Sequence, residues 1–276
     1  MDCPSVTAWR VARHRAKHQL TEKGFIFTDP LAIRILGEDG KTLSTEEDKP
    51  GEKSFRLFMA IRSRIAEDKL SQAVQRGIKQ AVIMGGGVDT FGLRNPHENS
   101  GLTVFEVDRP LMQNWKRQHL TREGITPPQS LTFVPVDFEQ DSLRSCLIHA
   151  GFNPNKPAFF SWLGVVPYLT RESIEKTLRF IAGIPDAEVV FDYGEPIENY
   201  DGNQRKLMEE RSKLVSSVGE PWLSRFNPKE MHKILSNSGF YNITDYDRDG
   251  ISSYFGWPAK ETQSKASPHV IDALVN

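Results

Sequence analysis

The chain has 276 residues, of which 38% are hydrophobic and 26% are charged, and its formal net charge at pH 7 is −1. That length suits one large α/β domain with a modest cap, and the balanced charge excludes the basic field typical of nucleic-acid-binding proteins. The balanced charge therefore leads us to expect a small-molecule partner. The two cysteines, Cys3 and Cys146, exclude a disulfide framework and a cysteine-based zinc site.

The first 76 residues indicate a helical N-terminal cap, and residues 5–20 form its first predicted helix. This helix brings Arg10, Arg13 and Lys17 near one face. Such a cationic face is usually solvated, but above an active site it would attract an anionic acceptor. Arg13 and Lys17 are therefore candidate substrate-binding residues.

The same helix carries His14 and His18, spaced four residues apart. A histidine pair at this spacing can bind a metal, but no third ligand of suitable spacing is evident. We expect two surface residues and no required metal.

Residues 53–76 form the second predicted helix of the cap. Arg62 lies on the helical stripe that also contains apolar residues, namely Phe55, Phe58 and Ile65. Arg64 lies off that stripe and can pair with Asp68 four residues later. Arg62 is therefore the first candidate for a buried anion contact, and Arg64 is the second.

From residue 77 onward, short apolar runs alternate with helical ones. The predicted strands are residues 79–84, 102–107, 131–136, 157–165 and 187–193, and the predicted helices between them are residues 110–120, 141–151 and 171–183. Runs rich in Val, Ile and Phe without polar alternation indicate a parallel sheet buried on both faces. The sequence predicts a doubly wound, Rossmann-like α/β domain over residues 77–276, with residues 195–224 as an insertion that extends the cap.

The C-terminal part predicts a helix and two strands. Asn227 can cap the helix, Pro228 suits its first position, and Gly239 ends it. Residues 240–248 and 251–257, separated by Asp249-Gly250, suggest a closing antiparallel hairpin that completes a mostly parallel seven-stranded sheet.

Three glycines follow the first predicted strand. In open parallel sheets, ligands bind at the carboxyl ends of the strands, where glycine lets the backbone approach and an acid on the next strand takes ribose hydroxyls. Gly85, Gly86 and Gly87 supply the first feature, and Asp108, at the end of the second strand, supplies the second. Thr90 stands where a dinucleotide site needs a third small residue, which disfavours NAD and favours S-adenosylmethionine.

Two further acids bear on this site. Glu106 shares the strand face of Asp108 and is the alternative hydroxyl partner, although Asp108 stands at the strand mouth. Asp137 and Phe138 follow the third strand, where an acid with an aromatic neighbour can hold adenine. A glycine turn and a helix-capping acid each have ordinary structural explanations, but packing alone does not require all three features together.

The chain resembles the class I methyltransferases related to leucine carboxyl methyltransferase and to the tetracenomycin-type polyketide carboxyl methyltransferases. The resemblance rests on motifs in the right order over roughly residues 8–195: FTDPLAIRILG, RSRIAEDKL, VIMGGGVDTFGLR, FEVDRP, FVPVDFE and FSWLGVVPYLT. It implies S-adenosylmethionine as cofactor, with Gly85 and Gly87 beside its methionine part. It further implies that Asp108 binds the ribose.

The resemblance also assigns Asp137 and the Phe138 amide to adenine, and an arginine of the second cap helix to the cofactor carboxylate. Trp162 stands where leucine carboxyl methyltransferases have a glutamate after the fourth strand. This departure favours a small-molecule acceptor over a protein phosphatase tail. Trp162 is retained as a cofactor-binding and acceptor-binding candidate, and Tyr168 as a lining residue of the acceptor pocket.

The expected function is O-methylation of a small carboxylate to a methyl ester. A carboxylate is already ionised at neutral pH, whereas a hydroxyl or phenol would need a general base, and no base constellation is evident. O-methylation of a hydroxyl, a noncatalytic S-adenosylmethionine-binding protein and a nicotinamide-dependent oxidoreductase are the alternatives. No stretch approaches the ~18 apolar residues of a membrane span, so we expect a cytoplasmic protein.

Overall fold

The computed structural model describes residues 3–37, 40–258 and 266–275. The chain forms two compact units, residues 1–152 (unit 1) and residues 153–276 (unit 2). Within the described ranges, no helix has both the length and the apolar character needed to cross a membrane.

Unit 1 contains three parallel strands and the helices around them. Its strands are β1 (Gln80–Met84), β2 (Thr103–Asp108) and β3 (Leu131–Pro135). Its helices are α1 (Val6–Thr21), α2 (Gly40–Thr45), α3 (Glu52–Gln75), α4 (Phe91–Arg94), α5 (Pro110–Arg122) and α6 (Leu143–His149), with 3-10 turns η1 (Arg34–Leu36) and η2 (Glu98–Ser100). Strand β2 pairs in parallel with both β1 and β3, and all five residues of β1 are buried, as its unbroken apolar run predicts.

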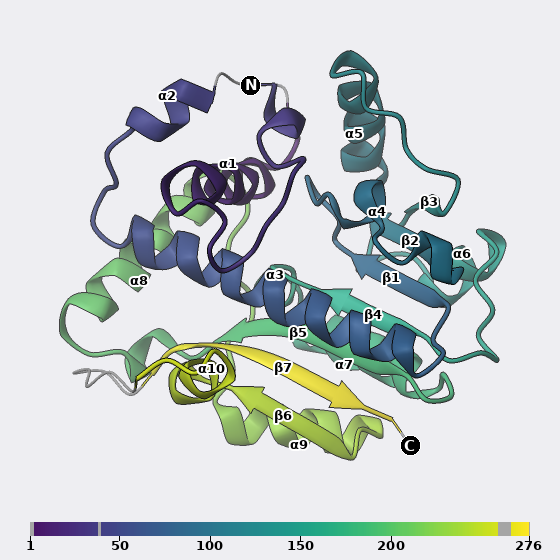
Figure 1. Ribbon diagram of the computed structural model, residues 1–276. Helices are drawn as coiled ribbons and strands as arrows, with labels where there is room; N and C mark the ends of the chain where they lie inside the picture. Colours follow the sequence, from purple (N-terminus) through teal and green to yellow (C-terminus); the bar gives the residue numbers. More distant parts are fainter. Residues whose placement is uncertain (1–2, 38–39, 259–265, 276) are drawn as a thin grey trace. The chain divides into compact units, whose positions relative to one another are not determined.

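Helices α1 and α3 confirm the helices predicted for residues 5–20 and 53–76, and their role as a cap stays a prediction. Ser5 begins α1, because its hydroxyl oxygen accepts a hydrogen bond from the Ala8 N–H at 3.1 Å. Helix α1 packs against α2 and α3 (Figure 1). Trp9 and Ala12 of α1 belong to a buried apolar cluster that also includes residues of η1, α2 and α5.

Unit 2 contains the remaining four strands. They are β4 (Phe159–Trp162), β5 (Glu188–Gly194), β6 (Asn242–Tyr246) and β7 (Pro268–Leu274). The helices are α7 (Arg171–Ala182), α8 (Gly202–Ser217), α9 (Pro228–Ser238) and α10 (Arg248–Tyr254), with 3-10 turns η3 (Val166–Tyr168) and η4 (Ile197–Asn199). Strands β4 and β5 are parallel, and β7 lies antiparallel between β5 and β6 (Figure 1).

The hydrogen-bonded strand order is β3-β2-β1-β4-β5-β7-β6. Five strands are parallel where their pairing is described, and β7 is antiparallel to both of its neighbours. The predicted fold class, a doubly wound seven-stranded sheet with an antiparallel final pair, is confirmed.

The predicted position of the last strand is wrong. Residues 251–257 do not form a strand, because the chain enters α10 at Arg248. The Asp247 carboxylate caps this helix by accepting the Gly250 N–H at 2.8 Å. The final strand is β7, whose Val270, Ile271 and Ala273 are fully buried. Residues 268–274 form the last strand because they can be buried between two partner strands. The Asp-Gly turn signal before residue 251 does not decide its position.

Helix α9 begins and ends as predicted, at Asn227 and Gly239, and Gly239 has a left-handed φ of 109°. The Asn227 side chain does not cap the helix, however. Its Oδ1 accepts a hydrogen bond from Asn199 Nδ2 at 2.7 Å instead, which ties η4 to the start of α9.

Candidate active site

The glycine loop, residues 85–87, is folded tightly onto the end of β2. The N–H groups of Gly85 and Gly86 both donate to the Val107 carbonyl, at 2.8 and 3.0 Å. Gly85 and Gly87 have left-handed φ values of 69° and 46°, which favour glycine. A Cβ atom added at Gly87 would lie 3.2 Å from the Ala8 Cβ of α1, so the first cap helix lies directly against the loop.

Asp108 joins this loop to the carboxyl end of β2. One carboxylate oxygen accepts the Gly87 N–H at 2.6 Å, and the other accepts the Arg109 N–H at 2.7 Å. Burial raises the pKa of Asp108, and these two N–H donors oppose that rise. The two residues that the sequence placed at neighbouring strand ends, Gly87 and Asp108, are in direct contact.

Glu106 lies beneath the loop rather than at its mouth. Its side chain is 0% exposed, and Oε1 pairs with Lys116 Nζ of α5 at 2.5 Å. Burial raises the pKa of Glu106 to about 7, although Lys116 opposes the shift. A Cβ atom at Gly86 would come closer than 3.0 Å to Glu106 Cγ, so the middle glycine leaves room for this carboxyl group.

A buried ionic network, which the sequence reasoning missed, ties α1 to the residue after the loop. Arg15 of α1 pairs with the Asp89 carboxylate at 2.9 Å and with Asp29 at 3.3 Å. Arg15 also donates to the Val88 carbonyl. Burial alone would raise the pKa of Asp89, but the Arg15 and Lys116 charges outweigh it and lower that pKa. The only sequence signal for this network is the FTDPLAIRILG motif, which contains Asp29.

The network continues to α3. Thr90, which disfavours a dinucleotide site, is fully buried and donates to Asp29 at 2.7 Å. Arg94 of α4 lies 3.6 Å from Asp29 and makes a two-pronged ion pair with Glu67 of α3. The glycine loop is thus held against both long cap helices through charged side chains.

Helix α3 presents its two candidate arginines differently. Arg62 is buried, with 7% of its surface exposed, whereas 48% of the Arg64 side chain is exposed. Arg64 pairs with Asp68 at 2.7 and 2.8 Å, which confirms the predicted ion pair. The buried position of Arg62 agrees with its place on the apolar stripe, and its contact with a cofactor stays a prediction.

The end of β3 adjoins Asp108. The Val136 N–H donates to the Asp108 carbonyl at 2.8 Å, which brings the next residues, Asp137 and Phe138, close to the second strand end. Asp137 Oδ1 accepts the Glu139 N–H at 3.0 Å, and both Asp137 and Phe138 are half-buried. Three successive strand ends of unit 1 therefore carry the predicted glycine, Asp108 and Asp137-Phe138 set.

The two candidates of unit 2 lie at and after the end of β4. Trp162 is the last residue of the strand, is fully buried, and packs at 6.1 Å between ring centroids against Phe191 of β5. Tyr168 ends η3 and is half-buried. Between these two residues, the Gly164 N–H donates to the Asp192 carboxylate at 2.6 Å, which fixes the turn after β4.

The cationic face of α1 is ion-paired with the segment that precedes α3. Arg13 pairs with Glu46 at 2.7 Å, and Lys17 pairs with Asp48 at 2.8 Å. Arg10 pairs with Glu52 at 3.3 Å. An acceptor bound by Arg13 or Lys17 would have to compete with these carboxylates, so their role toward substrate stays a prediction.

The expected surface location of the two α1 histidines is wrong. His14 is buried and its ring lies 5.1 Å from that of Phe55, and His18 is fully buried and bonded to Glu22 at 3.1 Å. The side of α1 that carries His14 and His18 packs against other parts of unit 1, so their four-residue spacing marks a buried helix face. In the part of the chain that the structure describes, no group of three or more His, Cys, Asp or Glu is placed to hold a metal.

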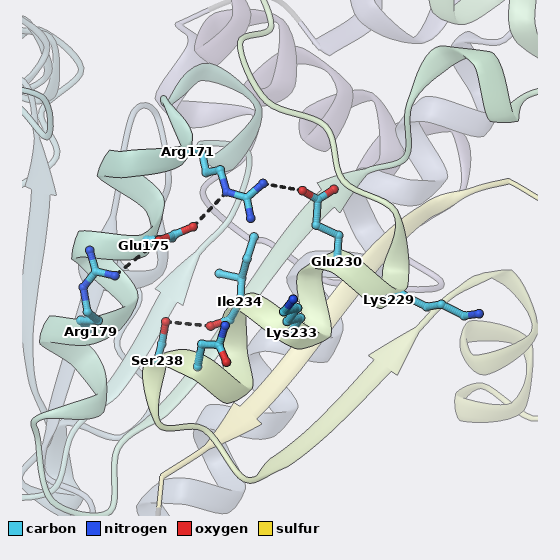
Figure 2. A pocket seen from close by; sticks show the side chains of 9 residues that line it. Arg171, Glu175, Arg179, Lys229, Glu230, Lys233, Ile234 and Ser238 are labelled. Atoms are coloured by element: carbon cyan, nitrogen blue, oxygen red, sulfur yellow. Dashed lines mark hydrogen bonds and ion pairs between the residues drawn. The ribbon is translucent and has the colours of Figure 1, made fainter.

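A cavity of about 400 Å³ lies elsewhere, between α7 and α9 of unit 2 (Figure 2). Its lining residues are polar or charged apart from Ile234: Arg171, Glu175, Arg179, Lys229, Glu230, Lys233, Asn237 and Ser238. Arg171 bridges Glu175 and Glu230 across it, at 2.9 and 2.5 Å. The cavity contains none of the predicted site residues.

Comparisons with known proteins identify the family of this chain. A sequence model of the leucine carboxyl methyltransferase family matches residues 8–182. YktD of Bacillus subtilis (strain 168), named as a candidate S-adenosyl-L-methionine-dependent methyltransferase, is 32% identical over 251 residues, covering 87% of this chain and 82% of YktD. A relative of the same description in Mycolicibacterium gilvum (strain PYR-GCK) is 26% identical over 239 residues, covering 87% and 74%.

Among solved structures, the CurJ carbon methyltransferase superposes with a TM-score of 0.52 at 15% identity. The superposition covers 99% of this chain and 68% of the CurJ structure. At this identity the likeness concerns the fold alone.

The residues of unit 1 fit S-adenosylmethionine. Each Asp108 oxygen accepts one backbone N–H, which leaves further lone pairs for a ribose diol. Glycine at 85 and 87 leaves bare backbone at the strand end, and no Walker-type phosphate loop occurs in the sequence. Given the family match over residues 8–182 and the 32% identity with YktD, the chain belongs to the leucine carboxyl methyltransferase family and is an S-adenosylmethionine-dependent methyltransferase.

Proposed function

We propose that this methyltransferase transfers the methyl group to the carboxylate of a small organic acid and forms a methyl ester. The observation that carries the proposal is the match of residues 8–182 to a family named for carboxyl methylation. Trp162 in place of the glutamate of the protein-modifying members supports a small acceptor.

We propose the cofactor seat at the three strand ends of unit 1. Gly85 and Gly87 would lie beside the methionine part of the cofactor, and the Asp108 carboxylate would accept the ribose hydroxyls. Asp137 and the Phe138 N–H would hold adenine, and Arg62 would pair with the cofactor carboxylate. The buried position of Arg62, against the exposed Asp68 pair of Arg64, supports the choice between the two arginines.

When bound, the cofactor supplies an electrophilic methyl group on a sulfonium. The protein then has to align the acceptor oxygen at about 3 to 3.5 Å and exclude water. A carboxylate with a pKa near 4 is ionised at neutral pH, so strong base catalysis is unnecessary. Helices α1 and α3 would form the cap that excludes water, and Trp162 and Tyr168 remain the proposed acceptor contacts.

The test is a screen of small carboxylic acids and phenols with methyl-labelled S-adenosylmethionine, read by mass spectrometry. We expect a labelled product that mild alkali hydrolyses. Turnover at saturating cofactor should be nearly flat from about pH 6 to 8, because the acceptor needs no deprotonation in that range. An alkali-stable product, with turnover rising about tenfold per pH unit, would identify an ether formed from a hydroxyl acceptor and refute the proposal.

A further inference from the structure

A buried carboxyl group lies directly beneath the glycine loop and has an incomplete set of partners. Glu106 is 0% exposed, and a Cβ atom at Gly86 would overlap its side chain. Oε1 is bonded to Lys116 Nζ, but among the described residues Oε2 has no hydrogen-bond partner. An ionised carboxylate normally needs several donors when buried, whereas a protonated carboxyl group needs fewer.

The charged groups around Glu106 do not hold it firmly in one state. Lys116, from α5, favours the ionised carboxylate, but its ammonium also donates to the Asp89 carbonyl at 2.7 Å. Asp89 in the loop exit and Asp108 on β2 are negative neighbours that disfavour ionisation. Desolvation acts in the same direction as these two acids, and the pKa of Glu106 rises to about 7.

The cofactor and its product differ in charge at this place. S-adenosylmethionine carries a positive sulfonium, and its demethylated product has a neutral thioether in the same position. We propose that Glu106 senses this difference: it releases its proton to solvent when the sulfonium form binds, and takes a proton back when the neutral product remains. The inference rests on the proposed seat of the methionine part at Gly85 and Gly87.

The geometry supports this coupling because Gly86 packs directly on the Glu106 side chain, and the proposed seat adjoins the glycines on either side of Gly86. A positive charge there favours the ionised carboxylate and lowers the pKa of Glu106, and a neutral thioether does not. Protein interiors screen such a pair only partly. As pH rises from 6 to 8, affinity for the sulfonium form should therefore rise by about three- to tenfold relative to the product. Glu106 would then be a specificity-determining residue that favours cofactor over product.

Calorimetric titration in two buffers of different ionisation enthalpy tests the proposal by counting the protons released on binding. With the wild-type protein at pH 7, we expect a fraction of a proton to be released with S-adenosylmethionine and clearly less with S-adenosylhomocysteine. The sulfonium also lowers the pKa of the ligand's own amino group, so the part of the difference due to Glu106 is the part that Glu106→Gln removes. Glu106→Gln should shrink the difference, and Glu98→Gln, the same change at an exposed position of unit 1, should keep it.

Equal proton release for both ligands in the wild type, or a ligand difference that is unchanged in Glu106→Gln, would overturn the inference. Lys116→Gln provides a second variant, because loss of the ammonium should move the proton-release window to higher pH. Absence of binding by either ligand would refute the cofactor seat itself. The acceptor screen is independent of these titrations, so a failed carboxylate assignment is distinguishable from a failed role for Glu106.

Discussion

Gly86 stands over the Glu106 side chain, and this position has no room for another atom. A Cβ atom there would lie less than 3.0 Å from three atoms of the buried glutamate. We expect Gly86→Ala to lower the free energy of unfolding by about 1 to 3 kcal/mol, through overpacking. Urea denaturation measures this change.

Gly183→Ala is the matched control. Gly183 has a φ of −82°, and the nearest atom to an added Cβ is the Phe180 carbonyl oxygen at an ordinary 3.4 Å. This change should be neutral or stabilise by about 0.4 to 1 kcal/mol. Equal effects of the two substitutions would show that Gly86 is not sterically constrained.

Substitutions of the two arginines of α3 distinguish a buried cofactor contact from a surface ion pair. If Arg62 pairs with the cofactor carboxylate, Arg62→Ala should weaken S-adenosylmethionine by about 1.5 to 3 kcal/mol. The binding free energy of an analogue without the carboxylate should fall much less in the same variant. Arg64→Ala removes only an exposed ion pair with Asp68 and should cost less than about 1 kcal/mol for either ligand. Titration calorimetry decides between them, and equal losses for both ligands in Arg62→Ala would give that residue a structural role.

Sequence reasoning succeeded for residues whose position follows from strand ends. Gly87 and Asp108 were predicted at the ends of neighbouring parallel strands, and there the Gly87 N–H donates to the Asp108 carboxylate. The partner of Glu106 could not be predicted in this way. Lys116 sits on the face of α5 that turns toward β2, and only the packing of that helix selects it over Arg117.

At the scale of elements, the end of unit 2 shows why local signals fail. Asp249-Gly250 fits a hairpin turn and the first turn of a helix equally well. The Asp247 cap decides for the helix. The strand that pairs with β6 is β7, which begins 26 residues after the start of β6 and places Asp272 opposite Thr244. Pairing on both sides of β7 is long-range information that a single segment does not contain.

A buried charge cluster joins β5, β6 and β7 at this end of unit 2. His269 Nδ1 is bonded to Asp245 at 2.7 Å, and its Nε2 lies 3.2 Å from Glu195. Asp245 also accepts the Tyr193 hydroxyl at 2.7 Å and contacts His232 at 2.9 Å. Burial alone would lower the pKa of His269, but Asp245 and Glu195 outweigh it and raise that pKa.

This cluster predicts a pH-dependent stability. A histidine whose folded pKa lies above the unfolded value of about 6.5 stabilises the fold fully below that pH, and loses the contribution as pH rises through the folded pKa. We expect His269→Gln to cost about 2 to 4 kcal/mol near pH 6. The difference from the wild type should shrink toward pH 9.

Chemical denaturation at several pH values measures this difference. His149→Gln, at an exposed histidine of α6, is the control and should show a small difference from the wild type that does not depend on pH. A His269→Gln penalty that stays constant or grows between pH 6 and pH 9 would contradict the charged cluster.

For the whole molecule, alternation of apolar runs with helices was enough to predict the doubly wound sheet, since runs such as β1 and β4 are buried on both faces. The order of motifs was enough to indicate the family. The network of Arg15, Asp29 and Asp89 was not predictable, because it joins residues up to 74 positions apart whose charges look like surface charges in sequence. These side chains form buried ion pairs only when α1 packs on the glycine loop.

The most direct test of the account is the affinity of S-adenosylmethionine for wild-type protein and for Asp108→Asn, measured by titration calorimetry. Asp186→Asn, at an exposed position, is the control, and thermal unfolding verifies that each variant is folded. The account predicts that Asp108→Asn loses about 1.5 to 3 kcal/mol of binding free energy, because the ribose hydroxyls lose a charged acceptor, while Asp186→Asn binds like the wild type. Equal affinity of Asp108→Asn and the wild type would contradict the proposed cofactor seat.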